Sequence, residues 1–272
     1  MAIRPIARKS SPPLSSLPSK AASFSPRAPA ACSPSTPSPR TWLPSCRRTP
    51  LERAARYTSS PVNSVILVNG PGGQGRVVLD ALQASGRHVT GVLDDILQPG
   101  ATVLGADVLG PVSSWKRRLD AGYELVVVTG NPALRRDLAE DILAAGGLLA
   151  RVVHPSATVS RHASLGRGVI ILAGSVVGPD ATIGDYALLN ANCAVDHDCV
   201  LGSGVTFGPG VTLAGVVTVG DSAFIGAGAT IMPGVTIGEN AVVGAGSVVI
   251  RPVPAGATVA GNPARPLAGR SA

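Results

Sequence analysis

The chain has 272 residues, of which 14 % are charged and 3 % aromatic, and its formal net charge is +7. This length allows two modest domains, each with a core of its own. The positive charge is confined to residues 1–62, which hold ten Lys and Arg but only one acid, Glu52, so the remainder is slightly acidic. Because nucleic-acid binding needs a basic face on a folded domain, the charge distribution argues against it.

Residues 1–62 form a leader with 13 Ser and 12 Pro. Such a segment buries too little apolar surface to offset its ordering entropy, so we expect disorder. One interpretation is an organelle transit peptide, for plastid or mitochondrion. The favoured one is a bacterial cytoplasmic protein whose start codon is placed too far upstream. No apolar run approaches the roughly 18 residues that span a bilayer, so no membrane span is expected.

Residues 63–152 alternate strand and helix patterns and predict a Rossmann-like α/β domain with a parallel sheet. SVILVNG (64–70) is a buried strand, and the next residues continue into a helix that ends at Gly86. HVTGVLDD (88–95) predicts a second strand, closing on two acids. ELVVVTG (124–130) predicts a later strand, followed by a helix through NPALRRDLAEDILAAGG (131–147).

A glycine-rich turn of GxGxxG pattern joins the first strand to the first helix, and its glycines are Gly70, Gly72, Gly73 and Gly75. Backbone N–H groups at a helix N-terminus favour a phosphate. Asp94 and its neighbour Asp95 follow about where a ribose-binding acid would lie. The domain is too short for a full dinucleotide fold, so NAD is a minor alternative. A nucleotide-sugar site and a purely structural turn both stay open.

From residue 153 every sixth residue is apolar, without an insertion. These positions are Val153, Val159, Leu165, Ile171, Val177, Ile183, Leu189, Val195, Leu201, Phe207, Leu213, Val219, Ile225, Ile231, Ile237, Val243 and Val249. A helix does not fit, because a step of six places successive residues about 240° apart around its axis. A prism with three six-residue sides per coil does fit. We expect the apolar residue to point inward, and the Gly that often follows it to supply an unusual φ at the turn.

Metal chemistry is not expected. Cys193 and Cys199 lie in the repeat without a CxxC pair, and one nearby His makes a poor zinc set with them. We therefore expect reduced thiols in the core. Carbonic anhydrases of the γ type share the prism, but they need three His ligands, and only His197 lies in the central coils.

Three segments, VDHDCVLG (195–202), VVGAGSVV (242–249) and GNPAR (261–265), resemble sugar acetyltransferases of the sialic-acid O-acetyltransferase (NeuD) and bacillosamine N-acetyltransferase (PglD) type. The resemblance covers roughly residues 63–267. It implies a left-handed parallel β-helix of hexapeptide repeats over 153–267, a tail at 268–272, acetyl-CoA as co-substrate, and a homotrimer with active sites between subunits. It also implies that domain 63–152 holds a nucleotide-sugar acceptor, although relatives carry Ser-Gly-His-Gly where this chain has Gly-Gly-Gln-Gly.

The predicted chemistry centres on Asp196, His197 and Asp198. An acceptor loses a proton as it attacks a thioester carbonyl, and a neutral imidazole accepts that proton near neutral pH. A carboxylate on the other ring nitrogen fixes the tautomer. The resemblance makes His197 the general base and Asp198 its orienting acid, with Asp196 as alternative. It adds Asn190 as a lining residue and the N–H of Gly215 as oxyanion donor.

Contacts to the acyl donor are predicted along the later coils. The pantetheine arm would bond to the backbone amides of Ala227, Gly228, Ala245 and Gly246. Arg251 and Arg265 would meet the phosphates, unless they are solvated tail residues. Where relatives carry a second His, nine residues after the base, this chain has Thr206. We expect Thr206 to contact the acyl donor in its place, and the identity of the acyl group stays open.

The leading hypothesis is acetyl-CoA-dependent acetylation of a nucleotide-linked sugar by direct transfer, with N-acetylation of an amino sugar favoured. O-acetylation of a sugar such as sialic acid is one alternative. A non-catalytic role as trimeric partner of a sugar-pathway enzyme is the other.

Overall fold

The computed structural model describes residues 64–68, 72–119 and 121–267. The predicted leader, Gly70 of the glycine-rich turn and the tail lie outside the described residues. No helix in the described ranges is both long enough and apolar enough to cross a lipid bilayer.

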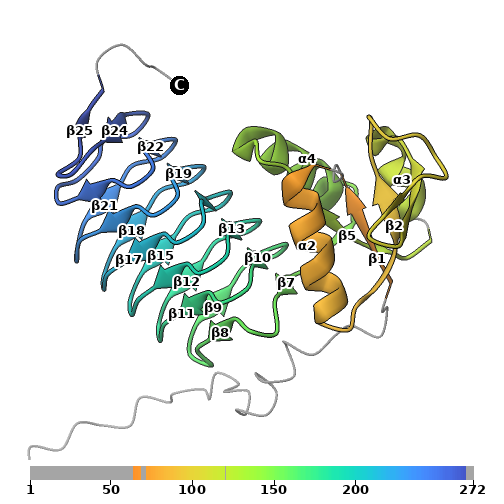
Figure 1. Ribbon diagram of the computed structural model, residues 1–272, viewed down its shortest axis with the longest axis horizontal. Coiled ribbons are helices and arrows are strands. Elements are labelled where there is room, and N and C mark those ends of the chain that lie inside the picture. Colours follow the sequence, from red (N-terminus) through yellow and green to blue (C-terminus); the bar gives the residue numbers. More distant parts are fainter. Residues whose placement is uncertain (1–63, 69–71, 120, 268–272) are drawn as a thin grey trace, which may run out of the picture. The chain divides into compact units, whose positions relative to one another are not determined.

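Residues 64–149 form the α/β domain, with a six-stranded sheet in the order β3-β4-β2-β1-β5-β6 (Figure 1). Its elements are β1 (Ser64–Val68), α2 (Gly73–Ala84), β2 (His88–Leu93), β3 (Thr102–Val103), β4 (Ala106–Gly110), the 3-10 helix η1 (Val112–Ser114), α3 (Trp115–Leu119), β5 (Glu124–Val127), α4 (Pro132–Ala144) and β6 (Leu148–Leu149). The strand pairs are parallel except β3 with β4. The structure confirms the predicted strands and helices, and it adds β3, β4, η1, α3 and β6.

Two helices follow neighbouring strands of this sheet, α2 after β1 and α4 after β5. Burial of Val78, Leu79 and Leu82 on one side of α2 fixes it to the sheet, each side chain contributing roughly 1.5–3 kcal/mol. The N-cap residue Asn131 begins α4, because its side chain accepts from the N–H groups of Ala133 at 3.0 Å and Leu134 at 3.2 Å. Both helix N-termini therefore lie at the carboxyl edge of the sheet.

The second part of the chain is a β-helix of short parallel strands, two residues long except for β24, stacked in the ladders of Figure 1 and closed by β25, which is antiparallel to β24. Three sheets form its faces. Face 1 has the order β25-β24-β22-β19-β16-β13-β10-β7, face 2 β23-β20-β17-β14-β11-β8, and face 3 β21-β18-β15-β12-β9. Pairs such as Ile171 with Leu189 join positions one coil apart, three hexads along the chain. This register confirms the predicted three-sided coil.

The strands of the β-helix have the following bounds. They are β7 (Val152–Val153), β8 (Thr158–Val159), β9 (Ser164–Leu165), β10 (Ile170–Ile171), β11 (Val176–Val177), β12 (Thr182–Ile183), β13 (Leu188–Leu189), β14 (Ala194–Val195), β15 (Val200–Leu201), β16 (Thr206–Phe207), β17 (Thr212–Leu213), β18 (Thr218–Val219), β19 (Phe224–Ile225), β20 (Thr230–Ile231), β21 (Thr236–Ile237), β22 (Val242–Val243), β23 (Val248–Val249), β24 (Thr258–Ala260) and β25 (Arg265–Pro266).

The hexad residues fill the prism as predicted, from Leu165 to Val249 in one continuous core. Only the first two, Val153 and Val159, are partly exposed, because no earlier coil covers them. Cys193 and Cys199 are buried free thiols in the same core. Their free, buried state agrees with the expectation of reduced core thiols, and desolvation raises the pKa of Cys193 to about 11.

The glycine prediction was wrong in one respect. The Gly directly after the hexad residue does not have a left-handed φ; that conformation lies two residues later, as in Gly204 at φ +70 and Asp198 at φ +57. The first glycine is required instead by close stacking of the coils. At Gly208 a Cβ would lie 2.5 Å from the backbone nitrogen of Ala227 in the next coil.

Three edges separate the faces, and each repeats every coil. The Asn190 edge (190–192, 208–210, 226–228, 244–246) runs between faces 1 and 2. The His197 edge (196–198, 214–216, 232–234) runs between faces 2 and 3. The Tyr186 edge (Tyr186, Gly204, Ser222, Asn240) runs between faces 3 and 1.

The α/β domain packs on face 1. Leu79 and Leu82 of α2 belong to the same buried cluster as Ile170, Leu172 and Leu188 of the β-helix. A shared apolar core of this kind makes the two domains one packed unit rather than two domains on a linker.

Candidate active site

The acid–histidine cluster lies on the His197 edge, and its three side chains are exposed. Nδ1 of His197 is 2.8 Å from Oδ2 of Asp198, and the backbone N–H of His197 donates to Oδ1 of Asp196 at 2.8 Å. The hydrogen bond to Asp198, and then the charge of Asp196, raise the pKa of His197. Of the two acids left open by the sequence, Asp198 is the one that contacts the ring.

Gly215 lies against the free side of this ring. It occupies the next coil on the same edge, where a Cβ would meet Nε2 and Cε1 of His197 at 2.5 Å. The following residue, Val216, has φ +64 and donates its N–H to the carbonyl of His197 at 3.0 Å. A β-branched residue in this conformation is strained, and such strain concentrates at functional sites. The structure thus brings Asp196, His197, Asp198 and Gly215 together.

Asn190 lies on a different edge of the same coil, so the structure does not place it beside His197. Its Nδ2 donates to the carbonyl of Phe207 at 2.8 Å, which fixes the amide. Its Oδ1 accepts from Nε2 of Gln74, in the first turn of α2, at 3.1 Å. Asn190 therefore ties the β-helix to the glycine-rich turn of the α/β domain. Gln74 stands where relatives have His, and only that departure pointed to it.

The two described glycines before α2 are open to solvent, whereas the two acids after β2 already accept hydrogen bonds from the backbone. Gly72 and Gly73 are exposed, and a Cβ on either would have no neighbour within 4 Å. Asp94 is buried, and its Oδ1 accepts from the N–H groups of Ile96 and Leu97 at 2.7 Å. Asp95 accepts from the N–H of Val112 at 2.9 Å.

Asp94 thus satisfies backbone donors of the turn that follows β2, and Asp95 satisfies a backbone donor at the start of η1. Their contacts therefore give the predicted sugar-binding role of Asp94 and Asp95 no support, unlike the open glycines. Gly75 is buried within α2.

Arg251 and Arg265 line one cavity of about 210 Å³ at the C-terminal end of the β-helix. Its other lining residues are Val249, Pro252, Val253, Pro254, Val259, Ala264 and Pro266. An apolar wall with two exposed guanidinium groups at its rim has the chemistry for a ring and a phosphate.

The four predicted amide donors lie on the Asn190 edge, but only two are free. Gly228 donates to the carbonyl of Pro209 at 2.8 Å, and Gly246 to that of Ala227 at 2.8 Å. These coil-to-coil bonds correct the prediction for Gly228 and Gly246. The N–H groups of Ala227 and Ala245 bond to no residue that the structure describes.

Thr206 is buried in the contact between the domains. Its Oγ1 accepts from the guanidinium of Arg135, on α4, at 2.6 Å. The prediction that Thr206 meets the acyl donor gains no support from this contact. Arg135 was not singled out from the sequence. Its position along α4 offered a signal, because it lies on the same buried face of the helix as Ala139 and Ile142.

In the described part of the chain, no three His, Cys, Asp or Glu side chains gather in a way that would hold a metal ion. The site thus consists of an exposed, oriented imidazole on a rigid coil edge, an open glycine turn on the adjoining domain, and an Arg-lined cavity further along the prism. Carried by a β-helix of hexapeptide repeats, such a set fits the class of hexapeptide-repeat acyltransferases.

The family models agree with this class. The bacterial transferase hexapeptide (six repeats) matches residues 180–215 and 217–251, and the PglD N-terminal domain matches residues 65–142.

Individual relatives agree as well. A solved variant of perosamine N-acetyltransferase from Caulobacter crescentus, in complex with CoA and GDP-perosamine, is 38 % identical, with TM-score 0.72, over 77 % of this chain and 99 % of that one. The acetyltransferase domain of PglB from Neisseria gonorrhoeae, with acetyl coenzyme A, is 35 % identical, with TM-score 0.72, over 75 % and 99 %.

A UDP-N-acetylbacillosamine N-acetyltransferase from Bacillus subtilis is 35 % identical over 113 residues, 40 % of this chain and 51 % of the relative, about half of its length. The chain belongs to the PglD-type family of hexapeptide-repeat sugar acetyltransferases. The predicted family and the predicted left-handed β-helix are thereby confirmed.

Proposed function

We propose that this protein transfers the acetyl group of acetyl-CoA to the amino group of a nucleotide-linked amino sugar. The observation that carries the proposal is the imidazole of His197, oriented by Asp198 at 2.8 Å and backed by Gly215. Solved relatives with CoA and GDP-perosamine bound support the substrate pair.

His197 acts as the general base. With Nδ1 hydrogen-bonded to Asp198, the lone pair of Nε2 is available to the acceptor amine. Nε2 takes the proton as the amine nitrogen bonds to the thioester carbonyl carbon, and the imidazolium then protonates the departing thiolate. Asp198 stabilises the imidazolium in between. Asp196 fixes the backbone that carries the ring.

Gly215 supplies the oxyanion donor. Its N–H bonds to no residue that the structure describes, so it is free to donate to the developing negative oxygen. A donor held by a stacked coil needs no reorganisation during the reaction, which is the main advantage of such preorganised sites.

The full site requires a second copy of the chain. His197 and Asn190 lie on different edges of one prism, and Ala227 and Ala245 share the Asn190 edge. His197 therefore meets the residues of the Asn190 edge only if the His197 edge of one copy faces the Asn190 edge of the next copy. A heterologous contact forms a ring when its rotation closes, and three copies arranged in this way would form a homotrimer. Light scattering on the eluted protein tests this, and a monomer with full activity would contradict it.

Acetyl-CoA would lie along the groove between copies. The free amides of Ala227 and Ala245 are placed for the pantetheine arm, and Arg251 and Arg265 for its phosphates. The acceptor nucleotide would lie on the open turn at Gly72 and Gly73, at the N-terminus of α2.

The test is an acetyl-CoA assay on nucleotide sugars that carry a free amine, each paired with its hydroxyl counterpart. The expected product gains one acetyl group on the amine only, by mass spectrometry, with CoA released. Acetylation of the hydroxyl partner would move the function to O-acetylation. His197→Ala should lower the rate by about 10²–10⁴-fold, the scale for losing a general base.

A further inference from the structure

The guanidinium of Arg135 is buried where α4 meets the β-helix, and 1 % of the residue is exposed. Its Nε donates to the carbonyl of Tyr186 at 3.1 Å, and Nη2 donates to the carbonyl of Gly204 at 2.8 Å and to Oγ1 of Thr206 at 2.6 Å. Nη1 donates to the carbonyl of Thr129 at 3.1 Å. A single side chain thus holds two consecutive coils and the loop that begins α4.

No carboxylate accepts from this guanidinium among the described residues; its partners are neutral oxygens. Burial lowers the pKa of Arg135 to about 10. A charge without a counter-ion is costly to bury. An apolar side chain would avoid that cost, but it would take away the hydrogen-bond donors that serve Tyr186, Gly204 and Thr206. Arg135 therefore fixes the geometry of this contact as well as filling space.

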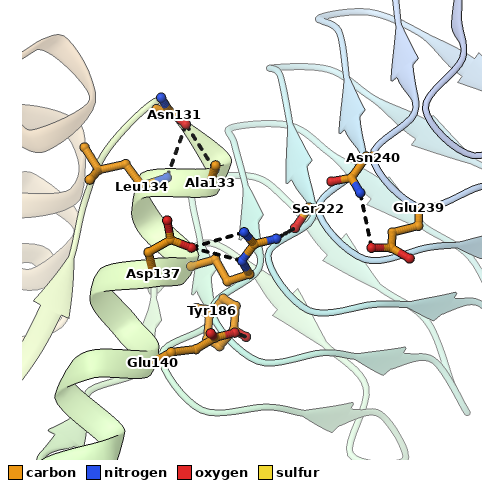
Figure 2. Close-up of polar contacts among 10 residues, drawn as sticks. Asn131, Ala133, Leu134, Asp137, Glu140, Tyr186, Ser222, Glu239 and Asn240 are labelled. Carbon is orange, nitrogen blue, oxygen red and sulfur yellow. Dashed lines mark hydrogen bonds and ion pairs between the residues drawn. The ribbon is translucent and has the colours of Figure 1, made fainter. Parts of the chain in front are cut away.

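The neighbouring contacts follow the same edge. Arg136 donates to Oγ of Ser222 at 3.2 Å, and the hydroxyl of Tyr186 donates to Oε1 of Glu140 at 2.9 Å (Figure 2). Tyr186 has φ +45, a conformation that a bulky residue rarely adopts. Contacts from α4 thus fall on successive coils of the Tyr186 edge, and together they fix how far along the prism the helix lies.

We call the contacts of Arg135 with Thr129, Tyr186, Gly204 and Thr206 the clamp. Its Thr129 end lies at the carboxyl edge of the sheet. Val68 of β1 pairs with Val127 of β5, so the loop at 129–131 and the glycines at 72–74 follow the carboxyl ends of neighbouring parallel strands. Ligands of open parallel sheets bind between two such loops. Gln74 ties the glycine turn to Asn190 at 3.1 Å, and Arg135 ties the other loop to Thr206.

We infer that Arg135 is a positioning residue, which holds the acceptor-side loop 129–131 at a fixed place on the coils that carry the catalytic edge. Thr206 accepts the hydrogen bond that anchors Arg135, and we do not assign it a contact with the acyl donor. It is the neighbour of Phe207, whose carbonyl accepts from Asn190. The inference rests on the proposed acceptor site. It assigns to α4 the task of presenting the nucleotide sugar to the base.

The first test compares Arg135→Met with Arg117→Met, a matched change of an exposed cation on α3. Arg135→Met should raise the KM of the nucleotide sugar by about tenfold and lower kcat, since misplacement near 1 Å has effects of up to about 10²-fold. The KM of acetyl-CoA should stay within about twofold, and Arg117→Met should match wild type. A merely structural residue would lower Vmax with both KM values unchanged, which would overturn the inference.

The second test uses Thr206, and it remains informative even if Arg135→Met does not fold. Thr206→Val keeps the shape but removes the acceptor oxygen, so the nucleotide-sugar KM should rise by about threefold, and Thr206→Ser should restore it. If Thr206 contacts the acyl donor instead, the acetyl-CoA KM rises alone, and the inference is wrong.

A readout without turnover separates this inference from the proposed function. Hydrogen exchange in the segment 128–134 should be faster in Thr206→Val than in wild type, with exchange in β13 and β16 unchanged. Equal exchange in both proteins would refute the clamp, even if the enzyme acetylates amino sugars. Faster exchange in a protein that acetylates no sugar would keep the clamp and reject the function.

Discussion

Gly215→Ala should lower the rate of acetyl transfer without unfolding the protein. The added Cβ would lie 2.5 Å from Nε2 and Cε1 of His197, whereas carbon contacts are favourable near 3.5–4.0 Å, so the ring must move by about 1 Å. The ring is the exposed end of a side chain, so it can rotate away with little cost to the fold. A displacement of this size lowers the rate by about 10²-fold. Acetyl transfer under saturating substrates measures this loss, with circular dichroism confirming the fold.

The comparison with His197→Ala makes the reasoning refutable. If the new Cβ acts only by displacing the ring, adding Gly215→Ala to His197→Ala should change the remaining rate by less than about twofold. An equal loss in both backgrounds would show that Gly215 acts by another route, such as its N–H. Activity of Gly215→Ala within about threefold of wild type would refute the close contact itself.

Three further outcomes follow from the structure. Asp198 raises the pKa of His197, so kcat/KM should fall as the pH drops through that raised pKa; Asp198→Asn should move this acid limb to lower pH, and an unmoved limb would count against the pairing. Arg251→Met with Arg265→Met should raise the KM of acetyl-CoA about tenfold but leave that of acetyl-pantetheine, which lacks the nucleotide phosphates, unchanged; an equal rise for both donors would reject the phosphate role. Phe207→Ala, in the prism core with no exposed surface, should lower the free energy of unfolding by about 3–5 kcal/mol in urea titrations, and a loss below about 1 kcal/mol would mean that the coils collapse around the gap.

The β-helix was predictable because its determinant is local and repeated. An inward position recurs every six residues, so one rule applied 17 times from Val153 to Val249 defines the faces. The same periodicity led to the wrong role for the glycines. The spacing shows where a small residue recurs, but not whether a left-handed φ or a close neighbour in the next coil requires it. At Gly208 the demand comes from Ala227, one coil away.

The cluster around His197 was predicted because its three residues are adjacent in the chain. Gly215, one coil later, was assigned only through resemblance, since its contact with the ring depends on stacking. Sequence likewise left the choice between Asp196 and Asp198 open, and the turn at φ +57 decides it by directing Asp198 at Nδ1.

The sequence by itself determined the repeat, the order of the domains and the family, because periodic burial and short motifs are written along the chain. Tertiary structure alone decided which side chains meet across the domain contact. Arg135 and Thr206 are 71 positions apart and join only because α4 packs along one edge of the prism. Asp94 and Asp95 show the converse, since backbone N–H groups, some of them distant in the chain, bond the carboxylates that a motif assigns to a sugar. Hydrogen bonds between distant segments depend on the packed positions of both partners, and local sequence carries no record of those positions.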